Sequence, residues 1–390
     1  MKVGIVVPST SRTGGGVSEV ARVTCLALRE AAQEEVQLQV HSLLNAHSEE
    51  DLPKWSPIDI EISKTIGPRR YGFTPSLLLS LLRAKPDIVH VHGLWMYQCL
   101  AVYIWHVLTG RPYIVTPHGM LEEWITRRHP ALKRFIQFVY QRRMIESAAF
   151  VQCLSSHEVS NVINSGHSGK NCTVIPNFVP EAAKNDIPPP WYKGEFADKT
   201  VYLFLGRIHP KKGWRELCNA WALACNESAS FANSSALAFC GWKDASDDFD
   251  SRLNDLARVH GNAFYFGPQF DEDKARSFLH SSVFLLPSFS EGLPMTVLEA
   301  WSHGVPAIIT PQCNLNDPEL QSCCVMTNPD AASIKESLLT FHALKPDERS
   351  AMGQRAKEMI AKKFSRHTVI NSLLDIYRQA RGSTAQVRQP

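Results

Sequence analysis

The residues of this chain best suited to chemistry are two glutamates eight positions apart, Glu291 and Glu299. Between them, Pro294 suits the first position of a helix, because its missing N–H is one that helices leave unpaired anyway. A helix from about Met295 directs free amides and the positive end of its dipole at the preceding loop, which favours an anion there. If the segment were helical throughout, the carboxylates would lie about 12 Å apart, close to the length of a nucleotide sugar from ribose to sugar. The alternative is a solvated helix residue at 299 and a plain loop carboxylate at 291.

A basic turn follows the strand expected over Val201–Leu205. Its sequence is GRIHPKKG, residues 206–213, and it carries Arg207 and Lys212. The two cations could converge on a diphosphate, Arg207 through its planar fork and Lys212 as a point charge. A leaving diphosphate gains charge as its bond to a sugar breaks, so such a pair stabilises the transition state. A basic turn in solvent remains the alternative.

A run of glycines, TGGGV at residues 13–17, follows the first expected strand and opens a helix. Gly15 and Gly16 allow a ligand to approach the backbone closely, and the helix start favours a phosphate or a polar sugar face. The run lacks the G-x-G-x-x-G spacing of dinucleotide sites. A plain flexible turn is the other interpretation.

Histidines stand at the ends of two other expected strands in the first half. His118, in the sequence TPHG, can donate a hydrogen bond to a sugar or act as an acid or base near neutral pH. Lone histidines are more often structural, so a structural role for His118 stays open as the alternative. His90 and His92 are two positions apart in a strand and therefore lie on the same face. We expect them mainly to line a ligand cleft at the carboxyl ends of the strands.

Composition sets the frame for these groups. The 390 residues are too many for one ordinary core, and 44% hydrophobic with 20% charged residues is typical of globular domains. A net charge of +3 is too weak to indicate nucleic-acid binding. The N-terminus predicts a strand over Lys2–Val7 rather than a signal peptide, and no apolar run is long enough to span a membrane. Ten cysteines without metal or redox spacing fit a reducing cytoplasm.

Short apolar runs alternate with helical patterns throughout, which is the signature of parallel α/β architecture. A proline-rich stretch over residues 176–191 has no periodicity and predicts a linker. We therefore predict an N-terminal domain over 1–182, completed by a C-terminal helix within 366–390, and a C-terminal domain over 195–365. The expected strands are Lys2–Val7, Val36–Leu43, Ile88–Val91, Tyr113–Thr116, Ala149–Leu154, Thr173–Ile175, Val201–Leu205, Leu237–Cys240, Ala263–Phe266, Val283–Leu286, Ala307–Ile309 and Cys324–Met326.

In combination these motifs resemble the retaining glycosyltransferases of family 4, a large class with the GT-B fold. The matching features are the E-x7-E segment, the Gly-Arg…Lys-Lys-Gly turn, the Thr-Pro-His-Gly strand end and the sequence VIPN at 174–177. The resemblance runs from about residue 1 to residue 380. It implies two Rossmann-like parallel-sheet domains facing across a cleft, with the C-terminal helix crossing back to the first domain.

The resemblance also implies roles for the residues. Glu299 would hold the ribose hydroxyls of a UDP- or GDP-linked sugar, and Glu291 would hold its hexose or N-acetylhexosamine. Arg207, Lys212, Gly15 and Gly16 would meet the diphosphate, together with backbone at Gly292, Leu293, Met295 and Thr296. His118 would contact the sugar near the reacting carbon, which makes the implied catalytic set His118, Glu291, Arg207 and Lys212.

In the reaction implied by the resemblance, a leaving phosphate oxygen takes the acceptor's proton on the same face of the sugar. Positioning and charge stabilisation are then the protein's task. No cofactor or metal is expected. Asp248 and Asp250 spell an acid-x-acid motif, but they lie in a polar turn, and we interpret them as a solvated face.

Residues 127–143 form a basic and amphipathic segment, which bears on the kind of acceptor that the protein uses. Leu132, Phe135, Ile136 and Val139 are predicted to share one helical face flanked by basic residues, as in segments that meet anionic lipid. A core-packed helix with arginines in solvent is the alternative. We expect a glycan or lipid-linked acceptor in bacterial surface-polysaccharide assembly, and a cytoplasmic protein, peripheral on the inner membrane if the segment meets lipid. A nucleotide-sugar epimerase or hydrolase, and a non-catalytic nucleotide-sugar-binding protein, are the competing functions.

Overall fold

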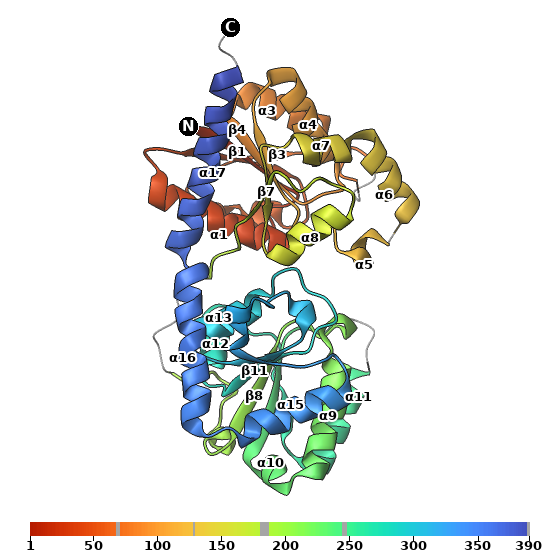
Figure 1. Cartoon of the computed structure of the whole chain (residues 1–390), viewed down its shortest axis with the longest axis vertical. Helices are drawn as coiled ribbons and strands as arrows, with labels where there is room; N and C mark the ends of the chain where they lie inside the picture. The colour runs from red at the N-terminus through yellow and green to blue at the C-terminus, as the bar shows by residue number, and fades with distance from the viewer. Residues whose placement is uncertain (68–70, 128, 180–186, 244–247, 388–390) are drawn as a thin grey trace. The chain divides into compact units, whose positions relative to one another are not determined.

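The computed structural model describes the chain apart from residues 68–70, 128, 180–186, 244–247 and 388–390, and part of the expected linker therefore lies outside the described residues (Figure 1). The chain forms two compact units. The first comprises Met1–Phe178 and Arg366–Pro390, and the second comprises Val179–Ser365. In the part of the chain that is described, no helix is long and apolar enough to cross a membrane.

The first unit is built on a parallel sheet of seven strands in the order β3-β2-β1-β4-β5-β6-β7. Because all strands run the same way, their carboxyl ends meet at one edge, where ligands of such sheets bind. The strands are β1 (Lys2–Val7), β2 (Gln37–Leu43), β3 (Asp59–Ser63), β4 (Ile88–His92), β5 (Tyr113–Thr116), β6 (Phe150–Cys153) and β7 (Cys172–Val174).

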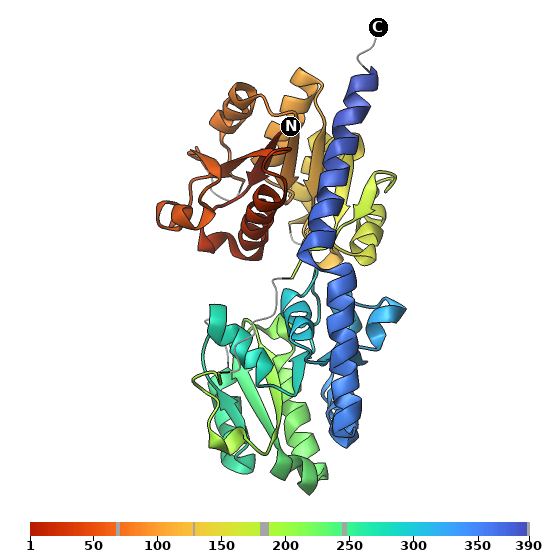
Figure 2. The same cartoon turned by 90° about the vertical axis from the view of Figure 1, so that its left-hand side faces the viewer.

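Helices pack around this sheet, and the last of them comes from the C-terminus of the chain. Helix α17 runs along the first unit and packs against α1 (Figure 2). Its residues Val369, Leu373 and Tyr377 are buried in the same cluster as Ile5 of β1. The helices are α1 (Gly15–Ala32), α2 (Ser48–Asp51), α3 (Pro75–Ala84), α4 (Tyr97–Thr109), α5 (Glu123–Thr126), α6 (Pro130–Ile136), the π-helical segment η3 (Gln137–Gln141), α7 (Arg142–Ser147), α8 (Ser156–Asn164) and α17 (Arg366–Val387).

The second unit repeats the design with a six-stranded parallel sheet in the order β10-β9-β8-β11-β12-β13. Its strands are β8 (Thr200–Leu205), β9 (Ser235–Cys240), β10 (Ala263–Tyr265), β11 (Val283–Leu286), β12 (Ala307–Ile309) and β13 (Cys324–Met326). Its helices are α9 (Trp214–Glu227), α10 (Ala229–Ser234), α11 (Phe249–His260), α12 (Asp271–Leu279), α13 (Met295–Ser302), α14 (Pro318–Gln321), α15 (Ala331–Ala343) and α16 (Pro346–Lys363).

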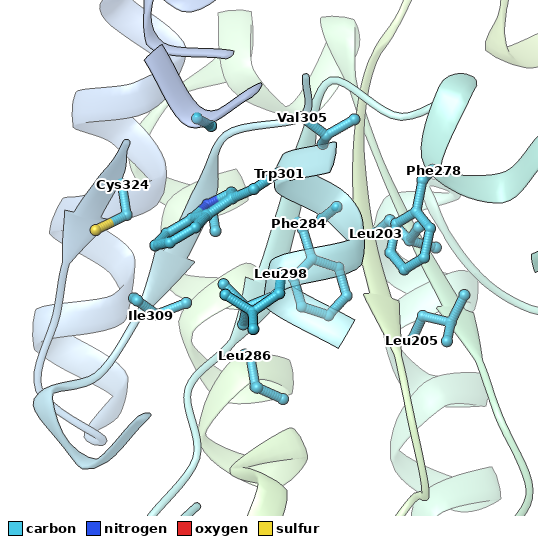
Figure 3. Close-up of a cluster of buried hydrophobic side chains, with 14 of the residues drawn as sticks. Leu203, Leu205, Phe278, Phe284, Leu286, Leu298, Trp301, Val305, Ile309 and Cys324 are labelled. Carbon is cyan, nitrogen blue, oxygen red and sulfur yellow. The ribbon is translucent and has the colours of Figure 1, made fainter. Parts of the chain in front are cut away.

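Helix α13 is anchored by one of the cores of the second unit. Figure 3 shows Leu298 from this helix beside Phe284 of β11, and Trp301 from the same helix extending towards Ile309 of β12. All four side chains are fully buried. Burying one such side chain stabilises a fold by roughly 1.5–3 kcal/mol, so this contact fixes where the helix begins relative to the strand end.

Most expected strands coincide with the observed ones, but two expectations about the first unit were wrong. Strand β3, at the edge of the sheet, was not among the expected strands. Leu132, Phe135, Ile136 and Val139 were expected to share one helical face, but only Ile136 is buried and the other three side chains are exposed. A π-helical turn interrupts this stretch and shifts the register of its faces.

Candidate active site

The strand ends of β8 and β9 are held together by close backbone contact. The Gly206 N–H donates to the Cys240 carbonyl oxygen at 2.9 Å. A Cβ atom on Gly241 would lie 1.8 Å from the Gly206 oxygen, so only glycine fits there. This packing fixes the first residues of the basic turn, including Arg207, which is exposed.

A second glycine brings the basic turn against the loop that follows β11. Gly213 has a φ of +72°, and a Cβ atom there would lie 2.0 Å from the Pro287 oxygen. The Phe289 N–H donates to the Lys211 carbonyl oxygen at 2.8 Å, which joins the two loops directly. The sequence thus positions Lys212 beside the segment that carries Glu291.

Lys212 and Glu291 form an ion pair. Lys212 Nζ lies 2.7 Å from Glu291 Oε1, and their side chains are 20% and 11% exposed. The Ser288 hydroxyl, which is fully buried, donates to the same oxygen at 2.6 Å. Within the described residues both of these bonds go to Oε1, which leaves Oε2 available to a ligand.

The loop around Gly292 is held by Asn314, a residue that the sequence analysis did not single out. Asn314 Nδ2 donates to the Glu291 carbonyl oxygen and, at 3.1 Å, to that of Gly292. The Glu291 N–H donates to the Gln312 carbonyl oxygen at 2.9 Å. These bonds tie up the loop's backbone, so the loop is preorganised before any ligand binds.

Helix α13 begins at Met295, as expected, but Pro294 is its N-cap rather than its first helical residue. Pro294 has φ −77° and ψ 94°, and no side chain among the described residues caps the helix start. Met295 and Thr296 are half-buried in its first turn. Since the residues before Met295 are not helical, the spacing of about 12 Å expected from helical rise does not apply to Glu291 and Glu299.

Glu299 has its own lysine partner. Lys274 Nζ, from α12, lies 2.5 Å from Glu299 Oε2, and the Glu299 side chain is 18% exposed. Lys274 was missed by the sequence analysis, because nothing in the sequence DEDKAR marks one lysine among its charged neighbours. The second unit therefore joins both predicted glutamates to lysines from other elements, Glu291 to Lys212 and Glu299 to Lys274.

The predicted groups of the first unit follow β1 and β5. A Cβ atom on Gly14 would lie 1.8 Å from Ser18 Oγ, so glycine is required there sterically. Gly15 has a φ of +62°, and a Cβ atom on Gly15 or Gly16 would meet no atom of the described residues beyond their own helix within 4 Å. Gly14 is therefore needed for packing and Gly15 for the backbone conformation, while Gly16 is free of both constraints.

His118 adopts a left-handed backbone conformation, with a φ of +55°, which is uncommon for residues other than glycine. Its Nε2 lies 2.9 Å from Nδ1 of His92, and the two rings stack with centroids 5.1 Å apart. Within the described residues this bond engages Nε2 alone, so Nδ1 is the ring nitrogen that His118 offers to a ligand.

His90 belongs to a buried hydrogen-bond chain whose direction can be assigned. Gln152 donates to the Ile175 carbonyl oxygen at 3.0 Å, so its own oxygen accepts from the Thr116 hydroxyl, also at 3.0 Å. Thr116 must then accept from His90 Nε2 at 2.7 Å, and His90 Nδ1 accepts from the Tyr377 hydroxyl at 2.8 Å. This chain of hydrogen bonds connects α17 to Ile175, the residue before Pro176.

The three histidines border a cavity of about 10 Å³ together with Thr116, Gln152 and Tyr377, enough for about one water molecule. Burial lowers the pKa of His118 to about 4 and that of His90 to about 3, and it also lowers the pKa of His92. With this pKa the His118 ring is neutral near pH 7, which favours the hydrogen-bonding role among those predicted for it, and its part in catalysis stays a prediction. His90 and His92 are buried rather than lining an open cleft.

Glu158 holds the loop that carries His118, and the sequence analysis missed it. The carboxylate accepts the Gly119 N–H at 2.5 Å and the Leu154 N–H at 2.6 Å. Burial raises the pKa of Glu158, and the two amide bonds oppose that rise. Ser155 caps α8 through the Glu158 N–H, and the S-x-x-E spacing of a helix start was the available signal.

Among the described residues, no group of three or more histidines, cysteines, aspartates or glutamates could hold a metal ion. The two aspartates of the acid-x-acid motif form ion pairs with basic side chains. Asp248 pairs with Arg215 at 2.8 Å and with Arg252 at 2.5 Å, and Asp250 pairs with Lys243 at 2.5 Å. Hydrogen bonds from these arginines lower the pKa of Asp248.

Family models identify both halves of the chain. Residues 15–177 match the model described as a glycosyl transferase 4-like domain, and residues 199–343 match that of glycosyl transferases group 1. The chain is a GT-B glycosyltransferase of the family 4 type. In this glycosyltransferase the two matches fall in the first and second units respectively, so each unit contains one match.

Individual relatives of the glycosyltransferase are distant. O-antigen chain mannosyltransferase B of Escherichia coli is 22% identical over 77% of this chain and 82% of its own length. The D-inositol 3-phosphate glycosyltransferase of Saccharomonospora viridis is 28% identical over 49% of this chain and 46% of its own. The structure of HepE from Anabaena in complex with UDP and glucose is similar, with a TM-score of 0.74 at 15% identity, covering 97% of this chain and all of that one.

Proposed function

We propose that this glycosyltransferase moves a hexose or N-acetylhexosamine from a UDP- or GDP-linked sugar to a glycan or lipid-linked acceptor, with retention of configuration. The observation that carries the proposal is the contact between Lys212 and Glu291 beside the start of α13. It puts a cation, a carboxylate oxygen and a helix N-terminus at one strand edge, and these are the groups that a sugar diphosphate needs.

The donor side of the proposal rests on how the charges of the second unit are held. An ammonium has three donors, and one of those on Lys212 is used by Glu291. The other two can meet diphosphate oxygens, with Arg207 on the same turn and the first amides of α13 adding to the positive field. Glu291 Oε2 would then meet a sugar hydroxyl, and Glu299, which is paired with Lys274, would meet the ribose.

The first unit contributes neutral groups to the proposed reaction. His118 Nδ1 would hydrogen-bond the sugar near its reacting carbon, and the open backbone at Gly15 and Gly16 would meet the diphosphate. In the proposed step, a leaving phosphate oxygen removes the acceptor's proton on the face from which the diphosphate departs. Residues 195–365 would bind the donor, and residues 1–182 with 366–390 the acceptor.

The acceptor class is proposed from the relatives and from the surface of the first unit. O-antigen chain mannosyltransferase B aligns with most of this chain, which supports a role in bacterial surface-polysaccharide assembly, such as that of lipopolysaccharide or exopolysaccharide. We propose a cytoplasmic protein that works at the inner membrane and needs no metal or other cofactor. Addition of EDTA should therefore leave turnover unchanged.

A panel of nucleotide sugars in a thermal-shift assay tests the proposal. A ligand of the folded state stabilises it by about 2.7 kcal/mol at one hundred times its dissociation constant, so a cognate UDP- or GDP-sugar should raise the melting temperature clearly. Turnover of the donor without an acceptor would instead indicate an epimerase or hydrolase. Binding without turnover in any acceptor extract would indicate a non-catalytic protein, and inversion at the anomeric carbon would refute the proposed mechanism.

A further inference from the structure

The stretch from α6 through η3 presents two apolar stripes that point in different directions. Ile136, Tyr140 and Met144 form the inner stripe and are buried in a core of the first unit. The outer stripe is exposed, and it comprises Leu132 (58% exposed), Phe135 (64%), Phe138 (83%) and Val139 (42%). The inner stripe packs the segment against the unit, and the outer stripe is left largely to solvent.

The outer stripe lies at the rim of the unit. Figure 1 shows α6 at the periphery of the first unit, away from the central strands. Four neighbouring large apolar side chains on one surface, two of them phenylalanines, exceed the scattered single residues that are normal on a protein surface. Such a patch indicates that something covers it.

The charge around the outer stripe indicates what covers it. From Pro130 to Ile145 the chain carries Lys133, Arg134, Arg142 and Arg143 and no acidic residue. The three arginines are exposed. Lys133 turns inward, with Nζ 5.3 Å from the centre of the Trp95 ring. A second copy of the chain on this patch would set arginines against arginines, so self-association is disfavoured.

We propose that the outer stripe docks the first unit on an anionic lipid surface, with Phe135 and Phe138 inserted and Arg134, Arg142 and Arg143 at the headgroups. A helix with an apolar face and flanking basic residues lies in the interface in this way. Anionic headgroups attract the arginines, while the acyl boundary takes the phenyl rings. The inference deepens the proposed function only in its acceptor, because a membrane-docked first unit meets acceptors anchored in lipid.

Flotation with phosphatidylcholine vesicles, with and without phosphatidylglycerol, tests the docking surface on the full chain. The wild type should float with phosphatidylglycerol vesicles and bind pure phosphatidylcholine vesicles far more weakly. Phe135→Ser/Phe138→Ser should weaken binding by at least about tenfold. Arg134→Gln/Arg142→Gln/Arg143→Gln, which keeps the side-chain length, should weaken it by about a hundredfold at low salt, at about fivefold per arginine.

The matched control is Val107→Ser/Leu108→Ser. These side chains of α4 are 65% and 64% exposed, in the same unit but outside the segment. Their replacement should leave vesicle binding unchanged. Unchanged melting temperatures in all three variants would show that lost binding is not lost folding.

Several outcomes would overturn the inference. They are a wild type that stays in solution with phosphatidylglycerol vesicles, a control variant that loses binding as much as the phenylalanine variant, and self-association that Phe135→Ser/Phe138→Ser abolishes. The nucleotide-sugar thermal shift, measured on the same variants, separates this inference from the proposed function. Donor binding without vesicle binding refutes the docking surface alone, and vesicle binding without donor binding refutes the proposed donor chemistry alone.

Discussion

The two units hold their polar groups in opposite ways. In the first unit, His90, His92 and His118 are kept neutral by burial and joined by rings and hydrogen bonds. In the second, Glu291 and Glu299 are each paired with a lysine and stay partly exposed. Both arrangements avoid an uncompensated buried charge, one by removing the charge and the other by pairing it.

The difference bears on the proposed donor site, in which Lys212 of the second unit would meet the diphosphate and His118 of the first unit would add a neutral hydrogen-bonding group for the sugar. A neutral, directional hydrogen-bonding surface suits a sugar, whose hydroxyls carry no charge. An ion-paired lysine near the surface suits a diphosphate, which can accept from the donors of the ammonium that the carboxylate does not use. The comparison therefore predicts that substitutions in the second unit act through charge, and those in the first through protonation and shape.

Lys212→Gln should give the largest effect on activity. It removes the cation beside the diphosphate but keeps a hydrogen-bond donor, so kcat/KM should fall by roughly 100- to 1000-fold, or about 3–4 kcal/mol, as for loss of one donor to a developing oxyanion. Steady-state kinetics with the cognate donor measure this. Lys211→Gln, one residue earlier in the same turn, should stay within about threefold of wild type. Equal losses in both variants would refute the specific role of Lys212.

The histidines of the first unit should make its stability depend on pH. A pKa of about 4 in the folded His118, against about 6.5 when unfolded, means that only the unfolded state binds a proton between these values. The histidine's contribution is complete above pH 6.5 and is lost as the pH falls towards 4. The slope is about 1.4 kcal/mol per pH unit for each such histidine.

His118→Asn isolates the contribution of His118 to this pH dependence, because asparagine tolerates the left-handed backbone conformation. The unfolding free energy of this variant, measured with denaturant between pH 4 and 6.5, should depend less steeply on pH. The reduction should correspond to about one bound proton. His129→Asn is the control, since His129 is exposed and has a similar φ of +53°. Its pH dependence should match wild type. An unchanged slope in His118→Asn would show that His118 already titrates normally in the fold.

Glu299→Gln should act on binding more than on turnover. A hydrogen bond to a charged group contributes about 1.5–3 kcal/mol, so the dissociation constant of the nucleoside diphosphate should rise by about tenfold or more. Lys274→Gln should reproduce part of that loss, because it frees the carboxylate from its partner. Calorimetric titration compares them with Glu319→Gln, a lysine-paired carboxylate on α14. Equal weakening in Glu319→Gln would point to net charge rather than ribose binding.

The sequence was informative where one element alone determines the outcome. Buried parallel strands such as Val283–Leu286 read as uninterrupted apolar runs, so their positions and the fold class were predicted and confirmed. β3 was missed because Asp59 and Glu61 interrupt it, as is usual at a sheet edge. Within the segment over 127–143, Ile136 was predicted on the wrong face, because the segment carries two apolar stripes and periodicity cannot tell which residues are buried.

The candidate site was also predictable only in part. Residue types placed after strands were predictable, since chain order brings strand ends to one edge. The partners of those residues were not. Lys274, Asn314 and Glu158 act through contacts with residues 25, 23 and 39 positions away, and only packing creates such contacts. The pKa of His118 likewise depends on burial that its own neighbours in sequence do not reveal.

The glycine run offers the finest test of the contrast between the units. Gly16→Ala meets no atom within 4 Å, so the unfolding free energy should stay equal or rise by up to about 1 kcal/mol through helix propensity. Gly14→Ala should be destabilised, because its Cβ would lie 1.8 Å from Ser18 Oγ. If a diphosphate approaches the backbone here, Gly16→Ala should still raise the donor KM several-fold in a stable protein. An unaltered KM would mean that the first unit meets the donor through His118 without the glycine run, and that the neutral hydrogen-bonding surface alone is its contribution.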